Sequence, residues 1–183
     1  MKVKPEDQLQ LYFIAIVPPH EVQSAITNLK HEIAEKYGSS HALNSPPHIT
    51  LHMPFKWKDK RFEELRQVMK GLNERLDPFI IELKDFDFFE PRVVFVDVLE
   101  NEQLNQLQAK VKDLCRKQLK LDNSDYKNHP FHPHVTIGFR DLKNVMFFEA
   151  KKEFVEREFR CKFQVQKITL LKHDGNKWDV VDF

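Results

Sequence analysis

The chain has 183 residues, which is long enough to bury one substantial hydrophobic core. Its 29 Lys and Arg residues are balanced by 28 Asp and Glu residues, and the net charge of +1 excludes a protein that binds polyanions through a strongly basic surface. The N-terminal residues lack the apolar region of a signal peptide, and no stretch approaches the length of about 18 apolar residues that a membrane span needs, so we expect a cytoplasmic protein with no membrane contact.

The chain contains two cysteines, Cys115 and Cys161. One falls in a helical pattern and the other opens a strand pattern. In an intracellular protein this usage favours two buried, reduced thiols over a disulfide or a metal site.

The first half of the chain predicts five elements from the spacing of its apolar residues. In chain order they are a strand at 11–17, a helix at 22–37, a strand that begins at 48, a helix at 62–76 and a strand at 79–89. The run at 11–17 is apolar throughout, as in a central strand buried on both faces. Gly38 is a stop signal for the first helix, and Asp59 can cap the second.

The second half repeats this order about 81 to 86 residues later, by direct counting. Its predicted elements are a strand at 92–99, a helix at 104–119 that Asn101 can cap, a polar loop at 121–129, a strand that begins at 134, a helix at 145–155 and a strand at 163–171. Asp174-Gly175-Asn176 then predicts a hairpin turn into a last strand at 178–183. The repetition indicates an internal duplication, with one lobe at about 1–90 and the other at about 91–183 of a single domain.

A short motif occurs at matching places in the two halves. Residues 47–51 read Pro-His-Ile-Thr-Leu, and residues 133–137 read Pro-His-Val-Thr-Ile. Side chains alternate between the two faces of a strand, so each motif places a histidine and a threonine on one polar face. The residues predicted on the polar faces are His48, Thr50 and His52, and His132, His134, Thr136, Gly138 and Arg140. The residues predicted to face the core are Ile49, Leu51 and Met53, and Val135, Ile137 and Phe139.

Two histidines that face each other across a cleft can divide acid–base catalysis between them. The ordinary histidine pKa of about 6.5 allows one imidazole to be neutral while the other is protonated. In-line displacement at phosphorus needs both, a base for the attacking group and an acid for the leaving oxygen. The hydroxyl groups of Thr50 and Thr136 can donate hydrogen bonds to the non-bridging phosphate oxygens. The sequence leaves open which histidine is the acid and which the base.

The paired segments PPHITLHMPF and HPHVTIGF resemble the two His-x-Thr signatures of the two-histidine (2H) phosphoesterase superfamily, the 2′-5′ RNA ligase-like proteins. The segments YFIAIVPP and FFEPRVVFVDV fit the layout of that family as well, so the resemblance covers residues from about 11 to about 183. It implies an α+β fold of two pseudo-symmetric lobes, each an antiparallel sheet with outer helices, around a central cleft.

The resemblance also implies an activity. It implies metal-independent cleavage of 2′,3′-cyclic or 2′-5′-linked ribonucleotide phosphodiesters, or RNA ligation in the reverse direction. His48 and His134 are then catalytic, and Thr50 and Thr136 bind the phosphate. We expect a monomer that acts on a nucleotide or RNA and needs no cofactor or metal.

Four further residues are candidates for substrate contact, namely His52, Phe55, His132 and Arg140. Phe55 could stack on a base or fill the core, and Arg140 could meet a phosphate or lie on an ordinary surface. Two other functions stay open. One is a non-catalytic nucleotide- or RNA-binding module that uses the same cleft. The other is a metal site of His48, His52, His132 and His134, which lacks Asp, Glu or Cys companions at ligand spacing.

Overall fold

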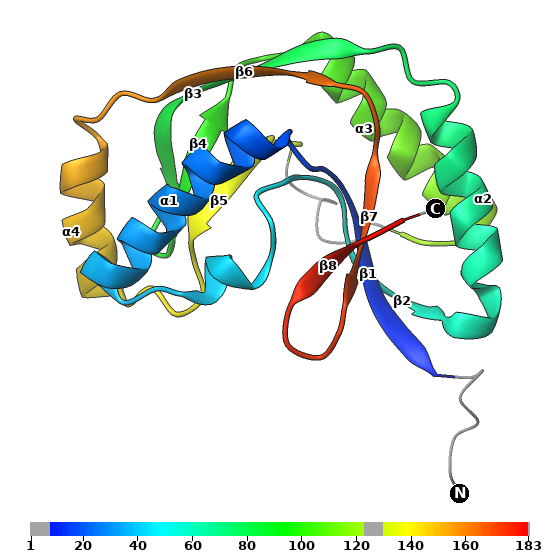
Figure 1. Ribbon diagram of the computed structural model, residues 1–183, viewed down its shortest axis with the longest axis horizontal. Helices are drawn as coiled ribbons and strands as arrows, with labels where there is room; N and C mark the ends of the chain where they lie inside the picture. Colours follow the sequence, from blue (N-terminus) through cyan, green and yellow to red (C-terminus); the bar gives the residue numbers. More distant parts are fainter. Residues whose placement is uncertain (1–7, 123–129, 183) are drawn as a thin grey trace, which may run out of the picture.

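Two four-stranded antiparallel sheets form the frame of the computed structural model, which describes residues 8–122 and 130–182 (Figure 1). Sheet A has the strand order β2-β1-β7-β8, with bounds Ile49–Lys58, Leu9–Ile16, Thr169–His173 and Trp178–Val181. Sheet B has the order β5-β4-β3-β6, with bounds His134–Gly138, Val93–Val98, Phe79–Phe89 and Arg160–Val165. Every pairing between neighbouring strands is antiparallel. The predicted α+β fold with antiparallel sheets is confirmed.

Four helices cover the sheets. They are α1 (His20–Tyr37), α2 (Phe62–Asn73), α3 (Glu102–Leu114) and α4 (Asn144–Phe154), with short turns η2 (His41–Asn44), η3 (Asp59–Arg61) and η4 (Cys115–Leu119). Gly38 ends α1 in the left-handed conformation, and the Asn101 side chain accepts a hydrogen bond from the Leu104 amide, so both predicted helix signals are confirmed. The prediction for Asp59 is wrong, because it begins η3 and binds the Gln10 side chain at 3.3 Å instead of capping α2.

The two sheets do not coincide with the two halves of the chain. Strand β3 of the first half pairs with β4 in sheet B, and β7 of the second half pairs with β1 in sheet A. The helices are exchanged as well, since α1 packs on β5 and α3 packs on β2. Figure 1 shows α1 and α4 beside sheet B, and α2 and α3 beside sheet A. The boundary expected near residue 90 therefore does not separate the sheets.

One predicted strand, at 163–171, is in fact two. The chain leaves sheet B after Val165 and enters sheet A at Thr169, so β6 and β7 pair with different partners. The hairpin turn after β7 is confirmed, because the Asp174 carboxylate accepts hydrogen bonds from the Asn176 and Lys177 amides at 2.7 Å. Most of the predicted polar loop at 121–129 lies outside the described residues.

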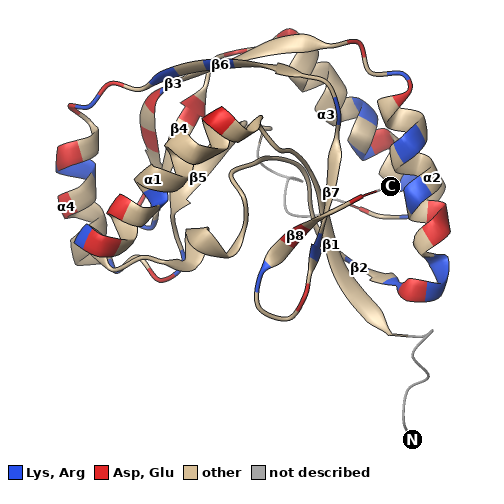
Figure 2. Cartoon of the chain, viewed as in Figure 1, with Lys and Arg blue, Asp and Glu red and all other residues tan. Residues whose placement is uncertain are grey.

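The distribution of charge on the helices agrees with the balanced numbers of acidic and basic residues. Lys and Arg alternate with Asp and Glu along α2, α3 and α4 (Figure 2). Both cysteines are free, as predicted, and Cys115 is buried, but the predicted burial is wrong for Cys161, which is partly exposed. Within residues 8–122 and 130–182, no helix has the length and apolar character needed to cross a membrane.

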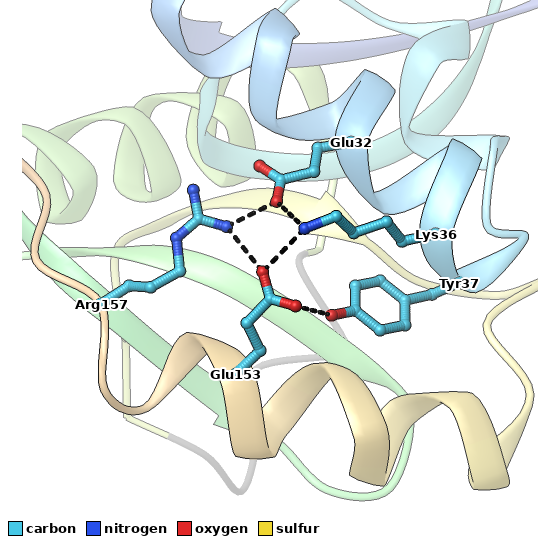
Figure 3. A network of polar contacts seen from close by, with 5 residues as sticks. All are labelled: Glu32, Lys36, Tyr37, Glu153 and Arg157. Carbon is cyan, nitrogen blue, oxygen red and sulfur yellow. Dashed lines mark hydrogen bonds and ion pairs between the residues drawn. The ribbon is translucent and has the colours of Figure 1, made fainter.

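A network of ion pairs joins α1 of the first half to α4 and the residues just after it in the second half (Figure 3). The Glu32 carboxylate accepts from Lys36 and Arg157, each at 2.8 Å. The Glu153 carboxylate accepts from the same two cations and from the Tyr37 hydroxyl at 2.6 Å. Alternation of two anions and two cations orders these long side chains together, although exposed pairs contribute little individually.

Helix α1 lies close to β5 at Gly138. A Cβ atom at this position would lie 2.9 Å from Cγ2 of Ile33, which is inside normal contact distance. Ile33 is fully buried, so it has little room to move away. Glycine at 138 therefore allows the helix of the first half to cover the second motif strand.

The Gly138→Ala variant is expected to lower the free energy of unfolding by about 1–3 kcal/mol, the usual cost of overpacking a core. Gly71→Ala is the matched control, because a Cβ at Gly71 in α2 meets nothing within 4 Å. That substitution should stabilise the protein by about 0.4–1 kcal/mol, since alanine has less freedom to lose in a helix. Denaturant unfolding measures both changes. Wild-type stability of Gly138→Ala would contradict the close approach of α1 to β5.

Candidate active site

The two His-x-Thr motifs meet where the sheets adjoin. Strand β2 is an edge strand of sheet A, β5 is an edge strand of sheet B, and the two strands contact each other. His48 immediately precedes β2, and His134 is the first residue of β5. The positive charge of His134 contributes to the lowered pKa of His48, as expected for two rings at one junction. Residues 86 positions apart in the chain (134 − 48) thus share one junction.

Both histidines are oriented by the same hydrogen bond. Nδ1 of His48 lies 2.7 Å from the carbonyl oxygen of Pro46, and Nδ1 of His134 lies 2.7 Å from that of His132. A carbonyl oxygen can only accept, so Nδ1 must carry the hydrogen in each ring. This fixes the tautomer of the neutral imidazole and leaves Nε2 with the free lone pair. Each ring therefore presents the same atom for proton transfer.

An aromatic ring from the neighbouring strand supports each imidazole. The Phe13 ring of β1 lies 4.7 Å from the His48 ring, and the Phe95 ring of β4 lies 4.8 Å from the His134 ring. Phe13 is 3% exposed and Phe95 is 0% exposed, so water does not reach the imidazoles from that side. Sequence analysis missed these two residues. The signal that could have found them was their matching place, 82 positions apart (95 − 13), in the two apolar strands.

Burial sets the protonation of both histidines. It lowers the pKa of His48 to about 4, and the positive charges of Lys30 and His134 act in the same direction. Burial also lowers the pKa of His134, while the Asp97 carboxylate opposes that effect. Both rings are therefore held away from the charged form, and a bound anion would favour protonation.

The threonines and the apolar residues next to them alternate between the two faces of their strands, as predicted. Thr50 lies opposite Ala15 and Thr136 lies opposite Phe95, and both threonines are partly exposed. The four apolar residues of the motifs are completely buried, as predicted, namely Ile49, Leu51, Val135 and Ile137. Each motif thus has a polar side at the junction and an apolar side in the core.

The alternation breaks after the threonine in both motif strands. In β2 the partner of Thr50 is Ala15 but the partner of His52 is Ile14, so two residues of β2 span one residue of β1. The same irregularity occurs in β5 between Thr136 and Gly138, at the matching position. Such a β-bulge turns the following side chain to the other face.

The bulge overturns the prediction that His52 shares a face with Thr50. His52 is 1% exposed, packs against Phe55 with ring centroids 5.4 Å apart, and is bonded through Nδ1 to the Met53 carbonyl. Phe55 is also buried and stacks on Tyr12 at 6.2 Å, so it fills the core and does not reach the junction. Neither residue is placed to contact a substrate. Gly138, predicted on the polar face, is buried under α1 for the same reason.

His132 lies beside His134, whereas Arg140 lies beyond the end of β5. His132 is exposed beside His134, with ring centroids 6.2 Å apart, and its Nε2 is 3.3 Å from the Asp97 carboxylate. Arg140 is exposed and lies 3.3 Å from the His41 ring nitrogen. Phe139 was predicted to face the core, but β5 ends at Gly138 and Phe139 packs against His41.

Asp141 ties the two motif regions together. Its carboxylate accepts hydrogen bonds from the Ser39 hydroxyl at 2.7 Å, the Ser40 amide at 2.9 Å and the His41 amide at 3.0 Å. The donors precede the first motif, and Asp141 follows the second. These charge-assisted bonds hold the segment that leads to His48 against the end of β5.

The four-histidine metal site is not assembled, since His52 faces the core. Within the part of the chain that the structure describes, no group of three or more His, Cys, Asp or Glu residues is arranged to hold a metal ion. The two motifs thus contribute two histidines and two partly exposed threonines to the junction.

Several known proteins are similar to this chain in sequence and in fold. The family model described as the 2′-5′ RNA ligase superfamily matches residues 18–177. The protein named "Putative phosphoesterase OB1230" of Oceanobacillus iheyensis is 28% identical over 172 residues, which cover 92% of this chain and 94% of that protein.

Solved structures have the same fold. The protein TT0787 of Thermus thermophilus superposes with a TM-score of 0.67 at 20% identity, over 94% of this chain and 95% of its own. LigT of E. coli complexed with 3′-AMP gives a TM-score of 0.67 at 20% identity, over 96% and 97%. The family match, the paired histidines and the exchanged sheets agree, and the chain belongs to the 2′-5′ RNA ligase superfamily.

Proposed function

We propose that this protein is a metal-independent phosphodiesterase that cleaves 2′,3′-cyclic or 2′-5′-linked ribonucleotide phosphodiesters, with His48 and His134 as the acid–base pair. The observation that carries the proposal is the matched hydrogen bond from Nδ1 of each ring to a backbone carbonyl at 2.7 Å. Two neighbouring imidazoles with the same free nitrogen suit a reaction that needs one base and one acid.

The residues around the histidines supply the rest of the chemistry. One Nε2 removes the proton of the attacking hydroxyl or water, and the other donates a proton to the leaving oxygen. The hydroxyl groups of Thr50 and Thr136 donate to the non-bridging oxygens, where negative charge is concentrated. The same groups catalyse the reverse reaction, RNA ligation, because the transition state is common to both directions.

The comparisons support a nucleotide as the substrate class. Relatives carry the name "Putative phosphoesterase", and LigT of E. coli, which has this fold, has been crystallised with 3′-AMP, NADP+ and ATP. A 2′,3′-cyclic mononucleotide is the simplest substrate in this class that contains a cleavable phosphodiester.

Turnover of a 2′,3′-cyclic mononucleotide is expected to continue unchanged in excess EDTA, because two imidazoles supply the proton transfers that a metal-bound water would otherwise provide. Product formation is measured by chromatography. Binding without turnover would instead identify a nucleotide-binding module. Loss of turnover in EDTA, restored by one divalent ion, would identify a metalloenzyme.

Replacing His48 or His134 by Ala should each lower kcat/KM by on the order of 10²–10⁴, the usual contribution of one acid–base group. The double variant should lose less than the product of the single losses, because both groups act in one transition state. His31→Ala, at an exposed position in α1, serves as the control and should retain full activity. Near wild-type turnover of either single variant would remove that residue from the mechanism.

The profile of kcat/KM against pH should be bell-shaped, with its acidic limb below pH 6.5. A base with a lowered pKa stays neutral, and therefore active, until the pH falls to that lower value; for His48 burial places it at about 4. Initial rates between pH 3.5 and 9, with circular dichroism to verify folding, give the profile. An acidic limb above pH 6.5 would contradict a buried base.

A further inference from the structure

On the side of sheet A, the aromatic contacts continue past the ring that supports His48. Phe13 lies 4.7 Å from the His48 ring and 4.6 Å from the Trp178 ring of β8. Trp178 pairs with His173 across the β7–β8 hairpin, and the centroids of these two rings are 4.9 Å apart. Phe13 is buried, whereas Trp178 is partly exposed. Trp178 is therefore the ring of this series that a ligand can reach.

The rings of this series lie on the face of sheet A that points away from the main core. Tyr12 of β1 points to the opposite face, where it stacks on Phe62 of α2 at 5.9 Å. The next residue, Phe13, belongs to a separate small cluster, as the alternation of side chains along a strand requires. The buried members of that cluster are Phe13, Ala15 and Leu171, and Val17 and Trp178 pack against them. An apolar surface thus adjoins His48 on its own face of the sheet.

The second half has a matching outer ring beside His134. Phe89 of β3 lies 5.0 Å from the His134 ring and 4.5 Å from Phe95, the ring that supports this histidine. It also contacts the exposed His132 ring, at 5.2 Å. Phe95 is completely buried, but Phe89 is 39% exposed. Each histidine is therefore followed by a buried phenylalanine and then by an aromatic ring that solvent reaches.

A nucleobase is a planar group that suits such a ring. Proteins that bind single-stranded nucleic acid stack its bases on exposed aromatic side chains, and this contact tolerates any base because every base has a π face. Trp178 belongs to sheet A and Phe89 to sheet B, while a phosphate held by the two motifs would lie where these sheets adjoin. The two exposed rings thus lie on different sides of the junction.

We propose that Trp178 and Phe89 are specificity-determining residues that stack on the two bases flanking a phosphodiester held at the junction. The inference rests on the phosphodiesterase function proposed above and narrows its substrate class. A diester with a base on each side, in a dinucleotide or in RNA, is preferred over a cyclic mononucleotide. A cyclic mononucleotide has one base and occupies only one of the two rings.

The first test is binding, measured by tryptophan fluorescence. The chain has two tryptophans, and Trp57 is 4% exposed, with its Nε1 donating to the Arg61 carbonyl at 2.7 Å, so it serves as an internal reference. The 2′-5′-linked dinucleotide of adenosine, added to full-length His134→Gln to prevent turnover, should quench the fluorescence of Trp178. The quenching should disappear when Trp178→Phe is added to this variant. Binding without quenching, or no binding, would overturn the role of Trp178.

The same titration compares substrates with two bases and with one. Adenosine 2′,3′-cyclic phosphate should bind about 5- to 150-fold more weakly than the dinucleotide, which is the effect of losing one stacked base. Equal affinities would overturn the preference for two bases. Neither measurement requires turnover, so failure of this inference is distinguished from failure of the proposed function.

The second test is kinetic and uses the dinucleotide. Trp178→Leu and Phe89→Leu should each raise KM by about 5-fold or more and leave kcat unchanged, because a stacked base is bound equally in the ground state and the transition state. Trp178→Phe retains a ring and should keep most of the affinity. Phe148→Leu is the matched control, since Phe148 of α4 is 45% exposed and packs on Phe147. That variant should leave both constants unchanged.

The pattern of these constants separates stacking from support of the histidines. A fall in kcat at constant KM in either leucine variant would overturn the stacking role of that residue. With the cyclic mononucleotide, only one of the two leucine variants should raise KM. An equal effect of both variants on that substrate would overturn the assignment of one base to each ring. Circular dichroism verifies that each variant is folded.

Discussion

The contact between the edge strands β2 and β5 is the constraint on which the site depends. Each motif contributes one histidine and one threonine to the junction, so the proposed acid–base pair forms only when the two strands meet. The contact is stabilised because elements of each half of the chain pack on the other half. Helix α1 packs on the second motif strand, α3 packs on the first, and β7 returns to pair with β1. Gly138 lets α1 lie close, and Asp141 fastens the segment before His48 to the end of β5. The two halves of the chain therefore cannot separate without disrupting the junction.

The surroundings of the imidazoles limit what the site can do. A buried phenylalanine beneath each ring excludes water from one side, and a backbone carbonyl fixes each Nδ1, so only Nε2 is free for the proposed proton transfer. Burial lowers the pKa of both rings, which keeps them neutral until an anion arrives. A phosphodiester would supply that anion. Substrate binding and activation of the acid are then coupled through the same electrostatic interaction.

Pseudo-symmetry and its violations have different roles in this fold. The carbonyl hydrogen bonds, the phenylalanine supports and the bulges after each threonine recur in both halves, because they set the orientation of the reacting nitrogen. Lys30 and Asp97 do not recur. Lys112, which lies 82 positions after Lys30 (112 − 30), is exposed, and β1 ends at Ile16, before a position that would pair with His48 as Asp97 pairs with His134. An acid–base pair needs two groups in different protonation states, and only an unsymmetrical environment can separate two chemically identical side chains.

The sequence by itself determined the repeated order of the elements, the two motifs and the side of the strand on which each motif histidine and threonine lies. These features follow from local periodicity, which a strand or helix expresses directly in its apolar spacing. The tertiary structure decided the exchange of strands and helices, the burial of His52 and Phe55, and the division of residues 160–173 into strands of different sheets. It also placed Phe13, Phe95, Lys30 and Asp97 around the imidazoles. Strand pairing, bulges and burial depend on residues distant in the chain, and alternation within one strand carries no information about its partner.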